Sequence, residues 1–141
     1  MLVRLMYASR ATETVRPEVL NAILRKSTQN NPAVGVTGVL CFSGNIYLQV
    51  LEGGRSHVSA LYNRIAADPR HSDVVLLSYE DIAERGFAGW SMGQVNMGRL
   101  NPALLLKYSE KAVLDPYTVT GKVSMALLNE LVATASVTSL P

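Results

Sequence analysis

Runs in which hydrophobic residues alternate with polar ones, or follow one another, predict five β-strands in this chain. The first run, LVRLMYA, places Val3, Leu5 and Tyr7 on one face of a strand. The runs VTGVLCF and IYLQVLE are separated by Ser-Gly-Asn, a composition typical of a hairpin turn. The predicted strands cover residues 2–8, 36–42, 46–52, 73–80 and 91–97.

Hydrophobic residues at helical spacing predict helices between the strands and after the last one. Residues 17–29 begin at a proline, which suits the first turn of a helix, and this helix is expected to stop before Pro32. Residues 55–67 form a second amphipathic helix that ends at DPRH. A short apolar piece around PALLLKYS precedes a further helix near residues 122–134.

The order of these elements, β-α-β-β-α-β-β, predicts an α+β fold with a ferredoxin-like sheet and two helices on one face. The opposite face then needs cover, and the apolar stripe of the last helix is long enough to provide it or to meet a second subunit. We therefore expect a sheet domain at residues 1–98, a C-terminal helical extension at residues 99–141 that covers the other face, and a homo-oligomer.

Composition and charge limit which binding partners and which cellular compartment are expected. The 141 residues are 48% hydrophobic, which fits one domain with a real core and a tail. The net charge is +2 without a basic run, so neither nucleic acid nor an anionic membrane is expected as a partner. The single cysteine, Cys41, allows no disulfide within the chain and favours a reducing compartment. The chain shows neither a signal-peptide core nor an apolar run near the ~20 residues that span a bilayer, so a cytoplasmic protein is expected.

The sequence offers little support for a catalytic or metal-binding motif of the common kinds. His57 and His71 are the only histidines, and neither has a partner at metal-ligand spacing. Cys41 alternates with Val39 in a core strand, which favours a small buried side chain over a nucleophile. The glycines of GVTG match no phosphate-binding motif. Hydrolase and nucleotide-fold functions are therefore disfavoured, and no metal site is expected.

Three polar residues remain as candidates for a binding site. Gln49 lies inside the hydrophobic strand IYLQVLE, where an unpaired amide would cost about 1–3 kcal/mol. Tyr7 on the first strand and Asn31 after the first helix have ordinary structural explanations, as a core tyrosine and a helix terminator. In a ferredoxin-like sheet, however, the first and third strands are neighbours, so Tyr7 and Gln49 can lie side by side beneath the two helices.

Four separated segments resemble successive motifs of one known family. RLMYASR, NNPAVGVTGVLCFSGNIYLQVLEG, YNRIAADPRH and FAGWSM are similar, in order and spacing, to the motifs of the BLUF family of blue-light sensors that use flavin. The resemblance covers about residues 1–98, and LLLKYS is similar to short stand-alone members with two extra helices. It implies a ferredoxin-like flavin-binding domain with the flavin held between the two helices.

The resemblance also implies roles for individual residues. Tyr7 corresponds to the photoactive tyrosine, Gln49 to the switching glutamine and Asn31 to the asparagine that binds the flavin ring. Trp90 and Met92 correspond to the pair on the last strand, for which a plain core role remains the alternative.

Three residues around the end of the second helix complete the expected flavin site. Arg64 and Arg70 are placed to meet a flavin phosphate or ribityl chain, with a solvated surface as the alternative, and Asp68 is expected to contact the ribityl group or to cap the helix. FAD is the expected cofactor, with FMN as the alternative.

The function implied is that of a non-enzymatic blue-light photoreceptor that binds flavin noncovalently. Tyr7 would give an electron and then a proton to the excited flavin, and Gln49 would exchange donor and acceptor toward a flavin carbonyl. The signal would pass to a downstream protein whose identity the sequence does not give. Two alternatives are a ferredoxin-like module that binds a small metabolite without photochemistry and a small flavin-dependent redox enzyme.

Overall fold

The computed structural model describes residues 1–134 and 137–138 of the chain, and these residues form a five-stranded sheet with helices on both faces. The strands are β1 (Leu2–Ala11), β2 (Thr37–Ser43), β3 (Ile46–Gly54), β4 (His71–Ile82) and β5 (Gly93–Asn96). The helices are α1 (Pro17–Val34), α2 (Arg55–Ala67), the short 3-10 helix η1 (Met97–Arg99), α3 (Pro102–Leu106) and α4 (Gly121–Ala133).

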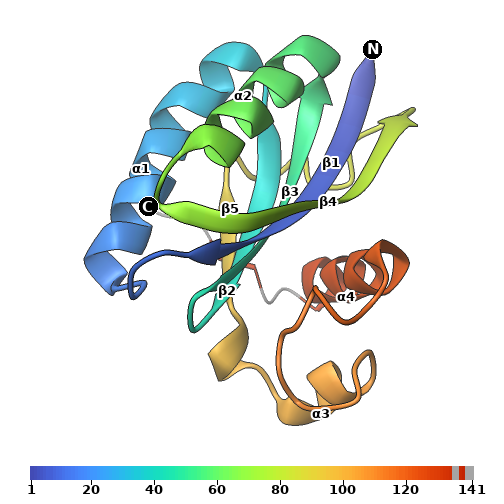
Figure 1. Cartoon of the computed structure of the whole chain (residues 1–141). Helices are drawn as coiled ribbons and strands as arrows, with labels where there is room; N and C mark the ends of the chain where they lie inside the picture. The colour runs from blue at the N-terminus through green and yellow to red at the C-terminus, as the bar shows by residue number, and fades with distance from the viewer. Residues whose placement is uncertain (135–136, 139–141) are drawn as a thin grey trace.

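The sheet has the strand order β4-β1-β3-β2-β5, and Figure 1 shows it between α1 and α2 on one side and α3 and α4 on the other. The pairs β1–β3, β1–β4 and β2–β3 are antiparallel, whereas β2 and β5 are parallel. This arrangement confirms the α+β, ferredoxin-like fold predicted from the order of the elements.

The face beneath α1 and α2 is built from alternate residues of the strands. Val3, Leu5 and Tyr7 of β1 point to this side, as the sequence pattern predicted, and they pack with Leu24 of α1 and Val58 of α2. This cluster is called the helix-side core below. All five side chains are almost fully buried.

The opposite face is covered by the C-terminal extension. Met6 of β1 and Leu48 of β3 pack there with Leu105 of α3 and with Leu128 of α4, in a cluster called the tail-side core below. The prediction that the extension folds back on this face holds for its described part, and residues 135–136 and 139–141 lie outside the described residues. Cys41 belongs to this core, and burial raises the pKa of its thiol to about 12.

Several predicted boundaries differ from those in the structure: β1 and β4 are longer than predicted, and two further differences bear on the site. The helix expected at residues 17–29 continues through Pro32 to Val34, because a Schellman motif ends it: the Gly35 amide donates to the Pro32 carbonyl at 3.3 Å and the Val36 amide to the Asn31 carbonyl at 3.0 Å. Gly35 has a φ of 69°, which glycine adopts without steric cost.

The last strand is also shorter than predicted. It covers Gly93–Asn96 instead of residues 91–97, so Trp90 and Met92 precede it. Its parallel partner is β2, and the pairing begins where Val39 meets Gly93. Trp90 and Met92 therefore belong to the irregular segment that leads into β5.

Among the described helices, none is both long enough and apolar enough to cross a bilayer.

Candidate functional site

Tyr7 and Gln49 lie directly opposite each other at the centre of the sheet. Tyr7 of β1 pairs with Gln49 of β3 in the antiparallel register, so both side chains leave the same face. The Tyr7 hydroxyl donates a hydrogen bond to Gln49 Oε1. Tyr7 is 1% exposed and Gln49 is 5% exposed, so this polar pair is buried in the helix-side core. The Gln49 amide, which interrupts a hydrophobic strand, is therefore hydrogen-bonded to Tyr7.

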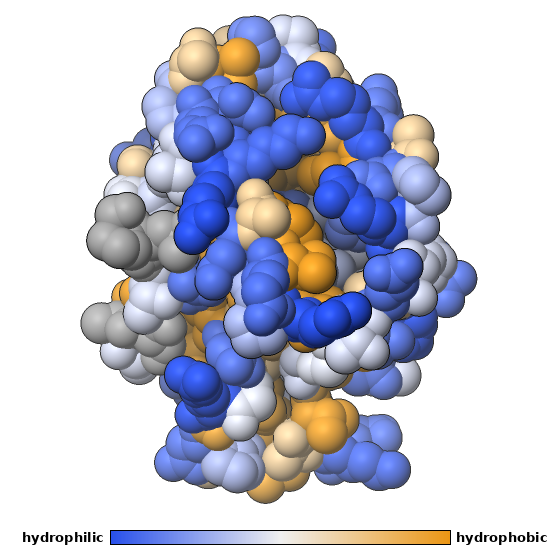
Figure 2. Space-filling model, turned by 90° about the vertical axis from the view of Figure 1, so that its left-hand side faces the viewer, coloured by the Kyte–Doolittle hydropathy of each residue, from blue (hydrophilic) through white to orange (hydrophobic). Residues whose placement is uncertain are grey.

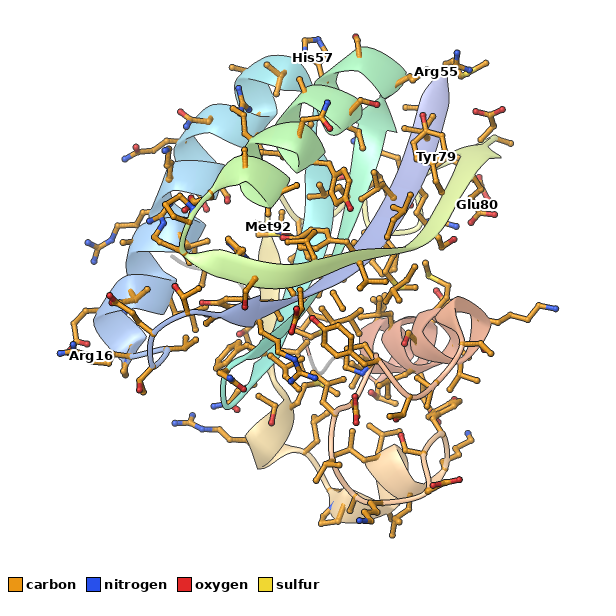
Figure 3. All side chains as sticks on the ribbon, viewed as in Figure 1. Arg16, Arg55, His57, Tyr79, Glu80 and Met92 are labelled. Carbon is orange, nitrogen blue, oxygen red and sulfur yellow. The ribbon has the colours of Figure 1, made fainter. Side chains whose placement is uncertain are left out.

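The other end of the Gln49 amide reaches the segment before β5. Gln49 Nε2 donates to Met92 Sδ at 3.3 Å, and Met92 is buried. Figure 3 shows Met92 in the interior, whereas Arg16 and Glu80 lie at the periphery of the molecule. Tyr7, Gln49 and Met92 therefore form one chain of contacts across three segments.

The environment of Tyr7 keeps its phenol neutral. Burial, with smaller contributions from the hydroxyls of Tyr47 and Tyr62, raises the pKa of Tyr7 far above its usual value of 10. The ring of Tyr62 on α2 lies 5.5 Å from the Tyr7 ring, measured between centroids. At neutral pH the proton therefore stays on Tyr7, where it makes the hydrogen bond to Gln49.

Asn31 joins α1 to the same segment. Its position in the final turn of α1 is fixed by the Schellman motif, in which its main-chain carbonyl accepts a hydrogen bond from Val36. Its side chain is buried, and Nδ2 donates to the Ser91 carbonyl at 2.8 Å. Asn31 therefore holds the residue next to Met92, which brings three of the predicted site residues, with Met92, to one place.

Trp90 lies on the other side of the sheet edge from Met92. Its side chain packs against the tail-side core, and its carbonyl accepts a hydrogen bond from the Gly38 amide at 3.0 Å. Met92 is the member of the predicted pair that contacts Gln49, while Trp90 is the member that contacts the C-terminal side.

The three charged candidates lie at the end of α2. Arg70 pairs with Asp68 at 2.7 Å, and the hydrogen bonds from Arg70 lower the pKa of Asp68 to about 2. Arg64 is exposed in the last turn of α2. The structure therefore separates these residues from the buried Tyr7–Gln49 pair and leaves them toward solvent.

Glu52 is a buried residue that the sequence reasoning missed, and it lies on the tail side of β3, the face opposite Gln49. Its side chain is fully buried, and its carboxylate accepts hydrogen bonds from the Gly86 amide at 3.0 Å and from the Phe87 amide at 2.7 Å. Arg4 Nη2 lies 2.7 Å from the same carboxylate. These bonds attach the loop that leads to Met92 to β3. An acidic residue inside IYLQVLE is as unusual as the glutamine, and that signal could have identified it.

A second missed contact lies on the helix side of the sheet, two residues along β1 from Tyr7. Ser9 is fully buried, and its Oγ lies 2.8 Å from His71 Nδ1. The His71 ring in turn lies 5.4 Å from the ring of Tyr47, measured between centroids. Burial lowers the pKa of His71, which favours the neutral ring at neutral pH. The histidine is thus part of the polar lining on this side of the sheet.

The shape and lining of this side suit a planar, partly polar ligand. Ile23 of α1 and Ile65 of α2 both pack on the helix-side core and are only partly buried. Figure 2 shows hydrophobic residues in a hollow that hydrophilic residues surround. Small-molecule sites combine such apolar walls with a few fixed polar groups, here Tyr7, Asn31 and Gln49. No cluster of metal-ligating residues occurs among the described residues.

Comparison with known proteins agrees with this geometry. The family model described as BLUF, sensors of blue light using FAD, matches residues 2–93. Among curated proteins, the chain is 37% identical over 92 residues to the photoactivated adenylate cyclase subunit beta of Euglena longa, an alignment that covers 64% of this chain and 11% of the relative. The corresponding subunit of Euglena gracilis is 34% identical over 105 residues, which cover 72% of this chain and 12% of the relative. The chain thus spans only a small part of these relatives.

Two solved structures are similar over almost their whole length. BlsA in its photo-activated state has a TM-score of 0.82 and 32% sequence identity, covering 93% of this chain and 94% of BlsA. The dark state of BlrB, described as a BLUF protein, has a TM-score of 0.80 and 32% identity, covering 95% of this chain and 96% of BlrB.

Proposed function

The chain belongs to the BLUF family, the sensors of blue light using FAD, and from this premise we propose that Tyr7 and Gln49 are its photoactive pair. The family and its structural relatives make the protein a flavin-binding blue-light sensor. The observation that carries the assignment of residues is the unbroken chain from the Tyr7 hydroxyl through the Gln49 amide to Met92.

Gln49 is suited to act as a switch because its amide has two different ends. Oε1 accepts from Tyr7, and Nε2 donates to Met92. Rotation of the amide, or conversion to its imidic tautomer, exchanges donor and acceptor while the side chain stays neutral and buried. Met92 is flexible enough to repack when its hydrogen bond from Gln49 is lost.

Residues on the helix side of the sheet and at the end of α2 are the candidates that would hold a bound flavin. The amide of Asn31 offers one donor and one acceptor to the edge of the ring, and Arg64, Asp68 and Arg70 are the candidates for its ribityl and phosphate groups. The flavin supplies absorption of blue light and, when excited, a strong electron acceptor. With flavin bound, Tyr7 would be the residue that gives it an electron and then the hydroxyl proton, and that takes both back afterwards. FAD is the cofactor by which the family is defined, and FMN is the alternative, since one structural relative, BlrP1 of Klebsiella pneumoniae, is described with FMN.

Absorption spectra before and after blue light test this proposal. The purified protein should be yellow and should show a reversible red shift, because an added hydrogen bond to the ring carbonyl lowers the transition energy. Gln49→Leu should keep the flavin and lose the shift, since leucine has similar volume without a donor. Full photoconversion in that variant would show that Gln49 is only a packed core residue. Bleaching that needs NADPH would identify a redox enzyme, and a colourless protein would identify a metabolite-binding module.

We propose that the protein signals by changing its contacts with other proteins, and not by a reaction that this chain catalyses. The matched region is the sensor, while the photoactivated cyclase subunits are far longer than this chain. We infer that residues 1–98 form the flavin-binding domain and that residues 99–141 transmit the signal to a downstream protein in the cytoplasm. The exposed hydrophobic side chains of Leu106 and Val113 in the C-terminal extension support a homo-oligomer, and a dark-state mass by light scattering tests it.

A further inference from the structure

Val137 and Thr138 lie along β5, the strand at one edge of the sheet. The Gln94 amide donates to the Thr138 carbonyl at 2.7 Å, and the Thr138 amide donates to the Gln94 carbonyl at 3.0 Å. This exchange of two hydrogen bonds is an antiparallel bridge. On its other side β5 pairs with β2. Thr138 therefore bridges an edge of the sheet with which no other described strand pairs.

The surface of β5 is shaped to receive an aliphatic side chain beside this bridge. A Cβ atom at Gly93 would lie 2.5 Å from Val137 Cγ1 and 3.0 Å from Trp90 Cγ. Only glycine leaves that space open. Val137 fills it and packs with the tail-side core. The edge thus combines main-chain hydrogen bonding at Gln94 with one apolar contact at Gly93.

The hold of this segment on β5 is slight. Among the described residues of this segment, it consists of the bridge at Gln94, the contact of Val137, and a marginal hydrogen bond of 3.5 Å from Thr138 Oγ1 to the Gln94 carbonyl. Exposed strand edges accept strands from other chains, with main-chain bonds giving affinity and side-chain contacts giving specificity. An extended segment of another protein can make the same contacts and displace this one.

We propose that the edge of β5 is a docking site for an extended segment of a partner protein, which adds as an antiparallel strand opposite Gln94 with a β-branched aliphatic residue over Gly93. Val137 and Thr138 occupy this docking site in the structure and compete with the partner. The seated segment is the evidence for the geometry and for the aliphatic residue.

The position of this docking site gives it a short connection to Gln49. Gln94 follows Met92 by two residues, and Met92 Sδ accepts the hydrogen bond from Gln49 Nε2. A change at that bond alters the segment that enters β5 directly. The docking site itself is independent of photochemistry, whereas its control by light rests on the proposed function.

A peptide of residues 134–141, carrying a fluorescent label, is the probe, and the full-length protein is the target. Thr138→Pro removes the amide that donates to Gln94, whereas Thr138→Val keeps this amide and removes only the hydroxyl. In the dark, the peptide should bind Thr138→Pro about ten-fold more tightly than the wild type, because loss of one hydrogen bond weakens the competing segment. Thr138→Val should bind the peptide with the same affinity as the wild type. A peptide with Val137→Asp should not bind.

Several results would overturn the proposal. Equal affinity for all three proteins, or no binding to any, would show that β5 is not a docking site. Hydrogen exchange at the Gln94 amide that is as fast in the wild type as in Thr138→Pro would contradict the bridge. A wild-type dimer that Thr138→Pro abolishes would assign the edge to a second copy of the chain instead of a separate partner.

Spectra of the same samples separate this proposal from the proposed function. Peptide binding in the dark without any red shift under blue light would support the docking site and reject the photoreceptor mechanism. A normal red shift with unchanged peptide affinity would reject the control of β5 by light. A red shift accompanied by a change in affinity would support both.

Discussion

At the scale of the residue, Gln49 shows how one buried polar side chain can reveal a functional site. Its place in the strand IYLQVLE broke the hydrophobic pattern, and the structure pairs it with Tyr7 on one side and Met92 on the other. The same reasoning applies to Glu52, which the sequence analysis passed over. The neighbouring strand β1 supplies Tyr7 to Gln49, as the predicted strand order allowed, and Arg4 to Glu52. The other partners, Met92, Gly86 and Phe87, lie in the distant segment between β4 and β5, which the pattern of the strand alone could not predict.

Tyr7→Phe should keep the flavin bound and abolish the red-shifted state. The phenylalanine ring fills the same volume, but the hydroxyl that donates to Gln49 Oε1 is gone. Absorption difference spectra after blue light measure the effect. Tyr117→Phe is the matched control, because the Tyr117 hydroxyl bonds the Asp73 carbonyl outside the site. A full shift in Tyr7→Phe would exclude the assigned role.

Glu52→Gln should lower the free energy of unfolding by about 3 kcal/mol, because it breaks a buried, hydrogen-bonded charge pair. A carboxamide cannot accept from both Gly86 and Phe87 while pairing with Arg4. Urea unfolding measures the loss.

Glu80→Gln is the control for this change, because Glu80 is the half-exposed second partner of Arg4 and should contribute at most about 1 kcal/mol. Equal stability of the two variants would show that the hydrogen bonds of the Glu52 carboxylate do not hold the loop before Met92 in place. A normal red shift with a shortened lit state in Glu52→Gln would connect that loop to the photocycle.

At the scale of the element, periodicity located the elements well and their ends less well. The helix at residues 55–67 has the predicted bounds, and the hairpin lies at the predicted turn, where Gly44 has a φ of 58°. The first helix runs past Pro32, because a proline in the last turn removes only one hydrogen bond and the Schellman motif at Gly35 supplies the end. The last strand is short because its pairing with β2 begins only at Gly93.

Leu128→Ala should destabilise the protein by about 2–5 kcal/mol, because this fully buried side chain fixes α4 to the sheet. Asn129→Ala, at the next and exposed position of the same helix, should change the free energy of unfolding by less than about 0.5 kcal/mol. Urea unfolding curves compare the two. Equal stabilities would mean that α4 does not pack on the sheet in solution.

At the scale of the whole molecule, the sheet separates the helix-side core, which contains the candidate site, from the tail-side core, which the C-terminal helices cover. Consecutive residues of β1 illustrate this: Tyr7 points to the helix-side core, and Met6 points to the tail-side core. The sequence predicted that the C-terminal helices cover the second face, because an apolar sheet face needs cover. It did not predict the bridge at Gln94, because a contact between residues 44 positions apart follows from packing of the whole chain and not from local pattern.

Deletion of residues 101–141 should leave the photocycle largely intact while lowering solubility. Among the described residues, the helix-side core contains none beyond Met92, so the truncated chain keeps Tyr7, Gln49 and Met92 with their described neighbours. The tail-side core loses Leu105 and Leu128 and exposes the apolar face of the sheet, which promotes association. Absorption spectra and the concentration of soluble protein measure the two effects.

The same deletion should also remove any change in assembly between dark and light, since the segment that follows Met92 and β5 is the physical route from the site to the C-terminal helices. Light can shift an equilibrium only if the two states differ in their contacts, and the deleted residues make those contacts on the tail side. Size-exclusion chromatography in the dark and under blue light compares the truncated and full-length proteins. Identical elution of both proteins in both conditions would show that the extension only covers the sheet, and the signal would then have to leave through another surface of the protein.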